Sequence, residues 1–216
     1  MNEEERLFKL YSYERELWER GCQNVAGLDE AGRGPLAGPV VAAAVVLHPG
    51  LHLPGLNDSK QVPQRRRETL FNLITEGAVA WKISIISAQD IDRYNILQAS
   101  IMAMSQAVVG LGIRPQHLLI DALRLPKLDI PQTPLVKGDT LSASIAAASI
   151  LAKVARDRIM DDLHREYPEY GFDHNRGYPT AAHLEVLGRI GPCPFHRQSF
   201  EPVKNWHLRG KQVCLF

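Results

Sequence analysis

Apolar and polar positions recur along the chain with two different periods. Over residues 3–20 the apolar positions, among them Leu7, Leu10 and Trp18, fall on one stripe at helical spacing, and Gly21 follows them. Positions three to four residues apart share one face of a helix, and a glycine after the last of them is a common stop. The pattern therefore predicts one amphipathic helix over residues 3–20.

From residue 25 onward the pattern becomes strand-like. Short apolar runs at residues 25–29 and 38–47 flank a glycine-rich turn at residues 31–35. The second run is continuously apolar, which is typical of a strand that is buried on both faces. The same reasoning predicts further strands at residues 81–86, 117–121 and 135–136, and helices at residues 63–75, 87–109, 142–167 and 180–187.

The order of these elements predicts the fold class. Strands come first and then alternate with helices, without an internal repeat or a low-complexity linker. That order indicates an α/β fold with a mixed β-sheet flanked by helices. A chain of 216 residues is long enough to bury one full core of this kind.

Composition and charge narrow the function classes only slightly. The formal net charge is +1, so no overall positive field marks a nucleic-acid partner, although a local basic face would still suffice. The three cysteines lack metal-binding spacing and fit a reducing compartment. His174, His183 and His196 are too dispersed to predict a metal site. With no long apolar run and no leader pattern, we expect a cytoplasmic protein without a membrane partner.

Four acidic residues stand at the ends of predicted strands, where acids are unexpected. Asp29 and Glu30 end the first strand. Asp121 ends another, and Asp139 follows a third. Burying a carboxylate there costs solvation, and a cluster of such groups repels itself unless cations neutralise it. Oxygen ligands suit Mg²⁺ or Mn²⁺, so the pattern favours a metal-dependent hydrolase. For each acid taken alone, the alternative is that its side chain caps a turn.

The turn between the first two strands is suited to contact a ligand through its backbone. Gly32 and Gly34 carry no Cβ, so their amide groups can approach a phosphate or sugar oxygen closely. Arg33 between them can reach a phosphate. A plain structural turn is the alternative.

Several other polar residues are candidates for substrate contacts. Ser59 and Lys60 lie in a loop before a predicted helix and can bind phosphate, unless the loop is merely a local turn. Lys153 stands four residues before Asp157, so a salt bridge within the helix is its plain alternative. Tyr178 lies in a polar loop, where an aromatic ring can stack on a sugar or a base instead of packing in the core.

These motifs together resemble those of the type 2 ribonucleases H, in the order of that family. The resemblance covers most of residues 25–200 and implies the ribonuclease H-like fold with a small helical C-terminal part. It divides the chain into an N-terminal helix (1–24), a catalytic domain (25–191) and a C-terminal segment and tail (192–216). The matching stretches are residues 27–40, 56–60, 120–121, 137–139, 147–157, 171–180 and 196–200.

The resemblance also implies a reaction and roles for residues. Enzymes of the family cut 5′ to a ribonucleotide in RNA·DNA hybrids or in duplex DNA, and leave a 3′-OH and a 5′-phosphate. In this sequence the match assigns two Mg²⁺ or Mn²⁺ ions to Asp29, Glu30, Asp121 and Asp139. It assigns recognition of the 2′-OH to Gly32, Arg33, Gly34 and Tyr178, and by analogy contacts to backbone phosphates to Ser59, Lys60, Ser149 and Lys153. Ala122 stands where some members carry glycine, which bears on the shape of that loop.

Three rivals to a type 2 enzyme remain at this stage. The type 3 branch usually has an additional N-terminal substrate-binding domain, whereas only about 24 residues precede the first strand here. A non-catalytic hybrid-binding module would be favoured by the loss of an acidic ligand, but all four are present. The glycine turn paired with Tyr178 argues against a resolvase or transposase-type nuclease. We expect a monomer.

The last five residues resemble a second, unrelated motif. Gln212-Val213-Cys214-Leu215-Phe216 is similar to the Q-x-x-L-F peptide by which bacterial replication and repair proteins dock on the sliding clamp. Leu215 and Phe216 can fill an apolar pocket while Gln212 makes hydrogen bonds. The alternative is a tail whose apolar residues fold back on the protein.

Overall fold

A five-stranded mixed sheet forms the centre of the molecule in the computed structural model, which describes residues 2–206. The strands lie in the order β3-β2-β1-β4-β5. β1 pairs antiparallel with β2 and parallel with β4, so the sheet is mixed, as the order of elements predicted. The strands are β1 (Val25–Ala31), β2 (Val40–Val46), β3 (Ala80–Ile86), β4 (His117–Asp121) and β5 (Gln132–Leu135).

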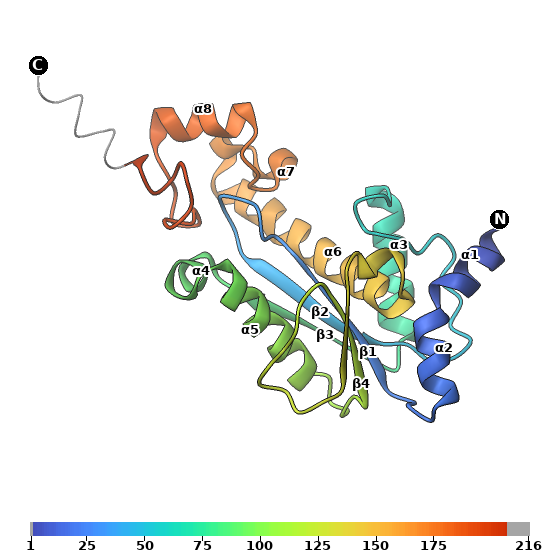
Figure 1. Ribbon diagram of the computed structural model, residues 1–216. Helices are drawn as coiled ribbons and strands as arrows, with labels where there is room; N and C mark the ends of the chain where they lie inside the picture. The colour runs from blue at the N-terminus through green and yellow to red at the C-terminus, as the bar shows by residue number, and fades with distance from the viewer. Residues whose placement is uncertain (1, 207–216) are drawn as a thin grey trace, which may run out of the picture.

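Helices cover both faces of this sheet (Figure 1). The helices α3 (Gln64–Gly77) and α6 (Ala143–Glu166) pack on one face, and α5 (Ile96–Val109) packs on the other. β2 is buried along its whole length, since its odd-numbered residues face α3 and α6 and its even-numbered residues face α5. Successive side chains of a strand point to opposite faces, which explains why this strand is continuously apolar.

A glycine in β1 lets α6 lie unusually close to the sheet. A Cβ at Gly27 would come within 2.1 Å of the backbone carbon of Ser144, so no larger residue fits there. α6 begins just before, where the hydroxyl of Ser142 accepts a hydrogen bond from the amide of Ile145. The contact holds the first turns of α6 against β1 and brings its next turns over the end of that strand.

Three elements differ from the prediction. The N-terminal segment forms two helices, α1 (Glu3–Leu10) and α2 (Ser12–Glu19), and the hydroxyl of Tyr11 between them donates to the carbonyl of Leu51. The predicted helix over residues 87–109 is also two, α4 (Ala88–Tyr94) and α5.

Asn95 separates α4 from α5. Its φ is 67°, and its side chain accepts a hydrogen bond from the amide of Gln98 at 3.1 Å, so it caps a new helix. The last difference is β5, which begins at Gln132 and includes Pro134 rather than covering residues 135–136. β5 is an edge strand, and only an edge position tolerates a proline that cannot donate to the sheet.

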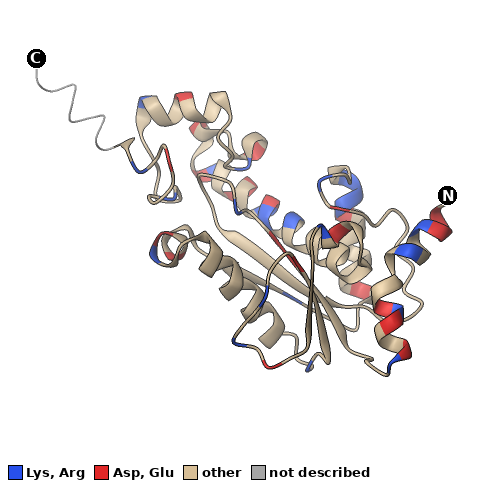
Figure 2. Cartoon of the chain, in the orientation of Figure 1, with Lys and Arg blue, Asp and Glu red and all other residues tan. Residues whose placement is uncertain are grey.

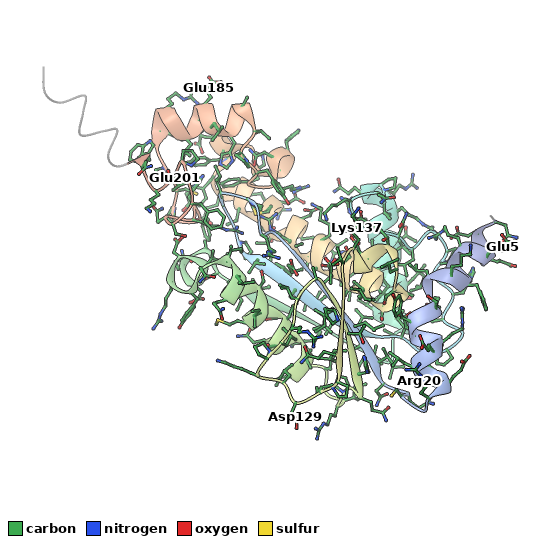
Figure 3. All side chains as sticks on the ribbon, viewed as in Figure 1. Glu5, Arg20, Asp129, Lys137, Glu185 and Glu201 are labelled. Atoms are coloured by element: carbon green, nitrogen blue, oxygen red, sulfur yellow. The ribbon has the colours of Figure 1, made fainter. Side chains whose placement is uncertain are left out.

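The C-terminal part packs at the end of the molecule opposite α1. It contains α7 (Phe172–Asn175) and α8 (Ala181–Ile190), and Figure 3 shows Glu185 and Glu201 of this part far from Glu5 of α1. The segment after α8 returns to the main body, where Asp92 of α4 accepts hydrogen bonds from the amides of Gln198 and Ser199, both at 2.8 Å. None of the helices within residues 2–206 is both long and apolar enough to cross a membrane.

Candidate active site

The sheet brings two of the predicted carboxylates side by side. β1 and β4 run parallel with Leu28 opposite Ile120, so Asp29 and Asp121 follow at the same edge. Asp139 joins them from the 3-10 turn Gly138–Thr140 that follows β5. The amide of Gly138 donates to Oδ1 of Asp121 at 2.8 Å, which ties this turn to the end of β4.

Burial and mutual repulsion raise the pKa values of the carboxyls on β1. Asp29 is almost fully buried, and burial first, then the charges of Glu30 and Asp121, hold its pKa well above its usual range. Burial also raises the pKa of Glu30, although the nearby Arg33 guanidinium opposes the shift. The Nη1 of Arg33 lies 3.4 Å from Oε1 of Glu30, whereas Oε2 of Glu30 is buried without a hydrogen-bond partner among the described residues.

A fifth carboxylate, Asp58, belongs to the same group and was not among the predicted ligands. Burial, and then Asp58 and Asp121, raise the pKa of Asp139 to about 6. Asp58 also accepts a hydrogen bond from the amide of Lys60 at 2.9 Å, so the local turn weighed as the alternative for this loop is present. The local sequence accounts for Asp58 as a turn residue. Its contact with Asp139 depends on how the two loops pack, which the sequence does not show.

The carboxylates fit a hard divalent cation by their chemistry. All the donors are oxygens, they are largely buried, and one of them, Oε2 of Glu30, has no partner of its own among the described residues. Among residues 2–206, no three His, Cys, Asp or Glu side chains already surround a single point at which an ion would sit. Asp29 and Glu30 are neighbours in a strand and start toward opposite faces, so Glu30 has to turn toward Asp29 and Asp121 to share an ion with them.

The strand-end loop carries one strained residue. Ala122, directly after Asp121, has a φ of 53°. This left-handed conformation costs little for glycine and more for alanine. The glycine that some members of the resembling family carry would relieve that strain, and the loop keeps its shape here with alanine.

A pocket of about 490 Å³ opens beside the carboxylates. It contains Asp29 and Glu30, the glycine turn and all the predicted phosphate contacts, while Asp121 and Asp139 lie outside its lining. Two arginines, Arg67 and Arg156, line it as well and were not predicted. The remaining lining residues are Ala31, Gly32, Arg33, Gly34, Ser59, Lys60, Ser149, Lys153 and Tyr178.

The two glycines of the turn lie in different surroundings. Gly32 has a φ of +99°, and a Cβ there would lie 2.2 Å from Nε of Arg156, so its side-chain position is already occupied. Gly34 lies beside the ring of Tyr178, where a Cβ would be 3.5 Å from Cε1, which is an ordinary contact. Tyr178 is 43% exposed, so its ring forms a wall of the pocket rather than part of the core.

The predicted phosphate contacts differ in how far solvent reaches them. Lys60 is exposed, whereas Ser59 and Ser149 are buried and the hydroxyl of Ser149 donates to that of Ser59 at 2.7 Å. Nζ of Lys153 lies 2.6 Å from Oδ1 of Asp157, so the salt bridge weighed as its alternative is present.

Lys153, Arg67 and Arg176 form a basic rim around Asp157. Arg67 and Arg176 lie 3.4 Å and 3.8 Å from its carboxylate oxygens. Arg176 also pairs with Asp161, so the three cations face two carboxylates and leave a small local excess of positive charge. Figure 2 shows the blue Lys and Arg residues gathered along α3 and the facing turns of α6.

Tyr178 is held in place by two histidines that are 13 residues apart in the sequence. Nδ1 of His183 lies 2.8 Å from the carbonyl oxygen of Tyr178, and a carbonyl only accepts, so this nitrogen carries a proton. Nε2 of His183 therefore accepts from Nε2 of His196 at 3.0 Å. Nδ1 of His196 in turn accepts from the amide of Cys193 at 3.0 Å. The chain of hydrogen bonds assigns one neutral tautomer to each ring.

Comparison with known proteins shows the family of the chain. A family model described as Ribonuclease HII matches residues 26–203. The chain belongs to the ribonuclease HII family. A Ribonuclease HII from Moorella thermoacetica is 57% identical over 199 residues, which cover 92% of this chain and 97% of that protein. Membership in the ribonuclease HII family confirms the assignment made from the motifs: the protein is an endoribonuclease, a metal-dependent hydrolase that acts on RNA·DNA hybrids.

Solved structures confirm the fold. The ribonuclease H2 from Pyrococcus horikoshii OT3 is similar with a TM-score of 0.74 and 28% identity, over 88% of this chain and 99% of that one. The ribonuclease HII in a PCNA complex from Archaeoglobus fulgidus is similar with a TM-score of 0.69 and 25% identity, over 84% of this chain and 96% of that one. A Bst ribonuclease HIII in complex with Mn²⁺ has a TM-score of 0.66 at 19% identity, over 88% of this chain and 71% of that one. At this low identity the similarity shows a shared fold alone. The family model and the relatives at 50–57% identity are ribonucleases HII, so the type 3 branch is not favoured.

Proposed function

We propose that this ribonuclease HII-family enzyme nicks the strand that contains a ribonucleotide, on its 5′ side, in RNA·DNA hybrids and in duplex DNA with a single embedded ribonucleotide. The observation that carries the proposal is the position of the glycine turn, which lies directly after Asp29 and Glu30 and lines the same pocket. A group that senses the sugar and a group that serves the scissile phosphate are thus only a few residues apart.

Four carboxylates form the proposed metal site. Asp29 and Glu30 on β1, Asp121 on β4 and Asp139 in the turn after β5 would hold two Mg²⁺ or Mn²⁺ ions. Ions bound there supply Lewis-acid stabilisation of the charge at the phosphate and a more acidic water. Asp58 supports the site by contact with Asp139.

The chain's own residues account for the outcome of the cut. Water adds to phosphorus on the side opposite the leaving oxygen, the bond from phosphorus to O3′ breaks, and O3′ takes a proton. The products are a 3′-OH and a 5′-phosphate on the ribonucleotide. Metal ions held by the carboxylate cluster would bind the phosphate beside the pocket, and the turn would bind the sugar that follows it, so that the cut falls on the 5′ side of that sugar.

Selectivity for RNA rests on the glycine turn and Tyr178. Only the 2′-OH distinguishes a ribonucleotide from a deoxyribonucleotide at a given position. The amides of Gly32, Arg33 and Gly34 offer donors to that oxygen, and the ring of Tyr178 offers a face for the sugar to rest on. A substrate without the 2′-OH leaves these donors without an acceptor.

The basic side of the pocket holds the phosphates that flank the cut. Lys60 and Lys153 supply charge, and Ser59 and Ser149 supply hydroxyls from the same wall. Because Lys153 already pairs with Asp157, its contribution is shared with Arg67 and Arg176 of the basic rim. We propose that the enzyme is a cytoplasmic monomer, and that residues 1–24, 25–191 and 192–216 serve as N-terminal helical segment, catalytic domain and C-terminal segment with tail.

The test is cleavage of a DNA duplex that contains one ribonucleotide, with Mg²⁺, Mn²⁺ or EDTA, beside an all-DNA duplex. We expect a metal-dependent nick 5′ to the ribonucleotide and no cut in the all-DNA duplex. Asp121→Asn should keep its fold by circular dichroism and lose about a hundredfold or more of the activity, because one charged ligand becomes neutral. Cleavage of long hybrids without any nick at a single ribonucleotide would contradict the proposed selectivity, and near wild-type rates in Asp121→Asn would contradict the proposed ligand.

A further inference from the structure

Two arginines are completely buried beneath the glycine turn. Arg197 is 0% exposed and Arg156 is 1% exposed. Neither lies within ion-pair distance of an Asp or Glu among residues 2–206, although buried charges are normally paired. Burial lowers the pKa of Arg197 to about 9, and the neighbouring Arg156 contributes to that shift. Burying two guanidiniums that have no ion pair among the described residues costs stability. Their hydrogen bonds show what these arginines hold in place.

The hydrogen bonds of Arg197 go to the backbone of the turn and of the residues that follow it. Its Nη1 donates to the carbonyl of Arg33 at 2.9 Å, and its Nη2 donates to the carbonyl of Gly32 at 2.5 Å. Its Nε and Nη2 both donate to the carbonyl of Gly38 at 3.0 Å, and Nη2 reaches Pro39 at 3.2 Å. A planar guanidinium with five fixed donors can hold four carbonyls at once, which a lysine cannot do.

Arg156 holds the rest of the same loop from the other side. Its Nη2 donates to the carbonyl of Ala37, and its Nε donates to that of Pro39, both at 3.1 Å. The loop carbonyls therefore point into the protein, toward the two guanidiniums. Gly32 packs directly on Nε of Arg156, which leaves the turn no room to rotate.

The direction of these carbonyls determines the direction of the amides. The peptide bonds after Gly32 and after Arg33 are trans, and in a trans peptide the C=O and the N–H point in opposite directions. The Gly32 carbonyl shares its peptide unit with the amide of Arg33, and the Arg33 carbonyl shares its unit with the amide of Gly34. With both carbonyls directed at Arg197, both amides are directed away from it. Because the turn lines the pocket and Arg197 does not, we infer that these amides face the pocket.

We propose that Arg197 is a positioning residue for recognition of the 2′-OH, because it fixes the two peptide units whose amides meet the ribose. The inference rests on the proposed function and adds a residue to it from the far end of the chain. Arg197 is itself held in place, since the next two residues, Gln198 and Ser199, are bound by Asp92 of α4. The residue before it, His196, belongs to the hydrogen-bonded chain that holds Tyr178. One segment thus fixes both sides of the sugar site.

The test compares binding of two duplexes by wild type and Arg197→Lys, in Ca²⁺ buffer to slow cleavage. One duplex carries a single ribonucleotide and the other is all DNA. One or two hydrogen bonds to the 2′-OH correspond to a preference of about fivefold to tenfold for the ribonucleotide duplex in the wild type. Arg197→Lys should reduce that preference to less than about twofold, while the Kd for the all-DNA duplex changes little. Lysine keeps the positive charge, so the substitution tests only the loss of the planar guanidinium with its several fixed donors.

Arg66→Lys is the matched control. Arg66 also donates to a backbone carbonyl, that of Pro54, and neither residue lines the pocket. Arg66→Lys should leave the preference for the ribonucleotide duplex unchanged. An Arg197→Lys protein that keeps the wild-type preference, or one that loses affinity for both duplexes equally, would overturn the positioning role. A wild type without any preference would overturn the proposed 2′-OH recognition itself, and the inference with it.

A second measurement needs no variant and covers the case in which Arg197→Lys does not fold. In ¹⁵N-labelled wild type, the amide signals of Arg33 and Gly34 should shift on binding the ribonucleotide duplex and shift much less on binding the all-DNA duplex. Equal shifts with both duplexes would show that these amides do not meet the 2′-OH, and the inference would be wrong.

Discussion

Gly32 shows how a single residue joins the backbone of the active site to the interior of the protein. Its carbonyl accepts from Arg197, and the space where its Cβ would stand contains Nε of Arg156. A side chain at this position is therefore excluded by conformation and by packing at once. The glycines of the turn were predicted to allow close approach of a ligand, and the structure adds that Gly32 allows close approach of the protein itself.

Gly32→Ala should strongly destabilise the protein. The substitution forces a residue with φ of +99° into a Cβ contact of 2.2 Å, so we expect a loss of about 2–4 kcal/mol in the free energy of unfolding, measured by urea titration. Gly50→Ala is the control, because Gly50 has a similar φ of +92° and nothing within 4 Å of its Cβ position. It should lose only about 1 kcal/mol. Equal losses in the two variants would show that Arg156 gives way and does not fix the turn.

At the scale of elements, the active site depends on where strands end and what packs behind them. The parallel pairing of β1 with β4 sets Asp29 beside Asp121. The glycine turn and Tyr178 come from different elements and meet because the carbonyl of Gly177 accepts a hydrogen bond from the amide of Leu36 at 2.8 Å. The two buried histidines then fix Tyr178 from the side of α8.

The histidine pair should make the stability of the C-terminal part depend on pH. Burial, and then His183, lower the pKa of His196 to about 4, so above about pH 6.5 both the folded and the unfolded protein hold this ring neutral. As the pH falls from about 6.5 toward 4, the unfolded chain binds a proton that the folded protein does not, and stability is lost. For this group alone we expect a loss of about 2 kcal/mol between pH 7.5 and pH 5.

Other groups also titrate in this range, so the measurement is a comparison of variants. His196→Gln keeps a donor for His183 and an acceptor for Cys193 but does not titrate. In urea unfolding at pH 7.5 and 5, its stability relative to wild type should improve by about 2 kcal/mol at the lower pH. His48→Gln is the control, because the ring of His48 bonds only to the neighbouring carbonyl of Pro49 among the described residues, away from the pair. A constant difference between His196→Gln and wild type at both pH values would show that the pair does not resist protonation.

At the scale of the whole molecule, the basic rim and the C-terminal segment that leads to the tail occupy different regions. The basic rim is formed by α3, α6 and the residue after α7, and the last described residues lie at the end opposite α1 (Figures 1 and 2). Val203 is buried with Leu36 and Leu187, so the segment that leads into the tail is anchored near the glycine turn. The predicted clamp residues Gln212, Leu215 and Phe216 lie outside the described residues, 2–206.

We propose that residues 212–216 dock the enzyme on a sliding clamp. The resemblance to the clamp-binding peptide supports this, as does the similarity to a ribonuclease HII whose solved structure is a PCNA complex. Deleting residues 212–216 should weaken clamp binding about tenfold or more, since the apolar anchors are removed, and should leave nicking of a free duplex unchanged. Leu215→Ala with Phe216→Ala, in a chain of full length, serves as the matched variant. Equal clamp affinity with and without the tail would contradict the docking role.

Most residues of the candidate site could be proposed from the chain alone, for a physical reason. Strand period and element order are local properties, and a parallel pair of buried strands necessarily brings its ends to one edge. Asp29, Asp121 and Asp139 could therefore be placed at strand ends from the sequence, and the pairing of β1 with β4 then shows that Asp29 and Asp121 lie at the same edge of the sheet. The motifs in register added the family, which the family model and the relatives then confirmed.

The rest was decided by packing between segments that are distant in the sequence. Asp58 already had a local role in its turn, so only the approach of its loop to Asp139 shows it in the site. The histidines looked dispersed because 13 residues separate the two that touch. Arg197 follows the turn that it holds by more than 160 residues, and no periodicity relates the two. Local patterns depend on neighbouring residues, whereas buried hydrogen bonds depend on which distant groups the folded core brings together.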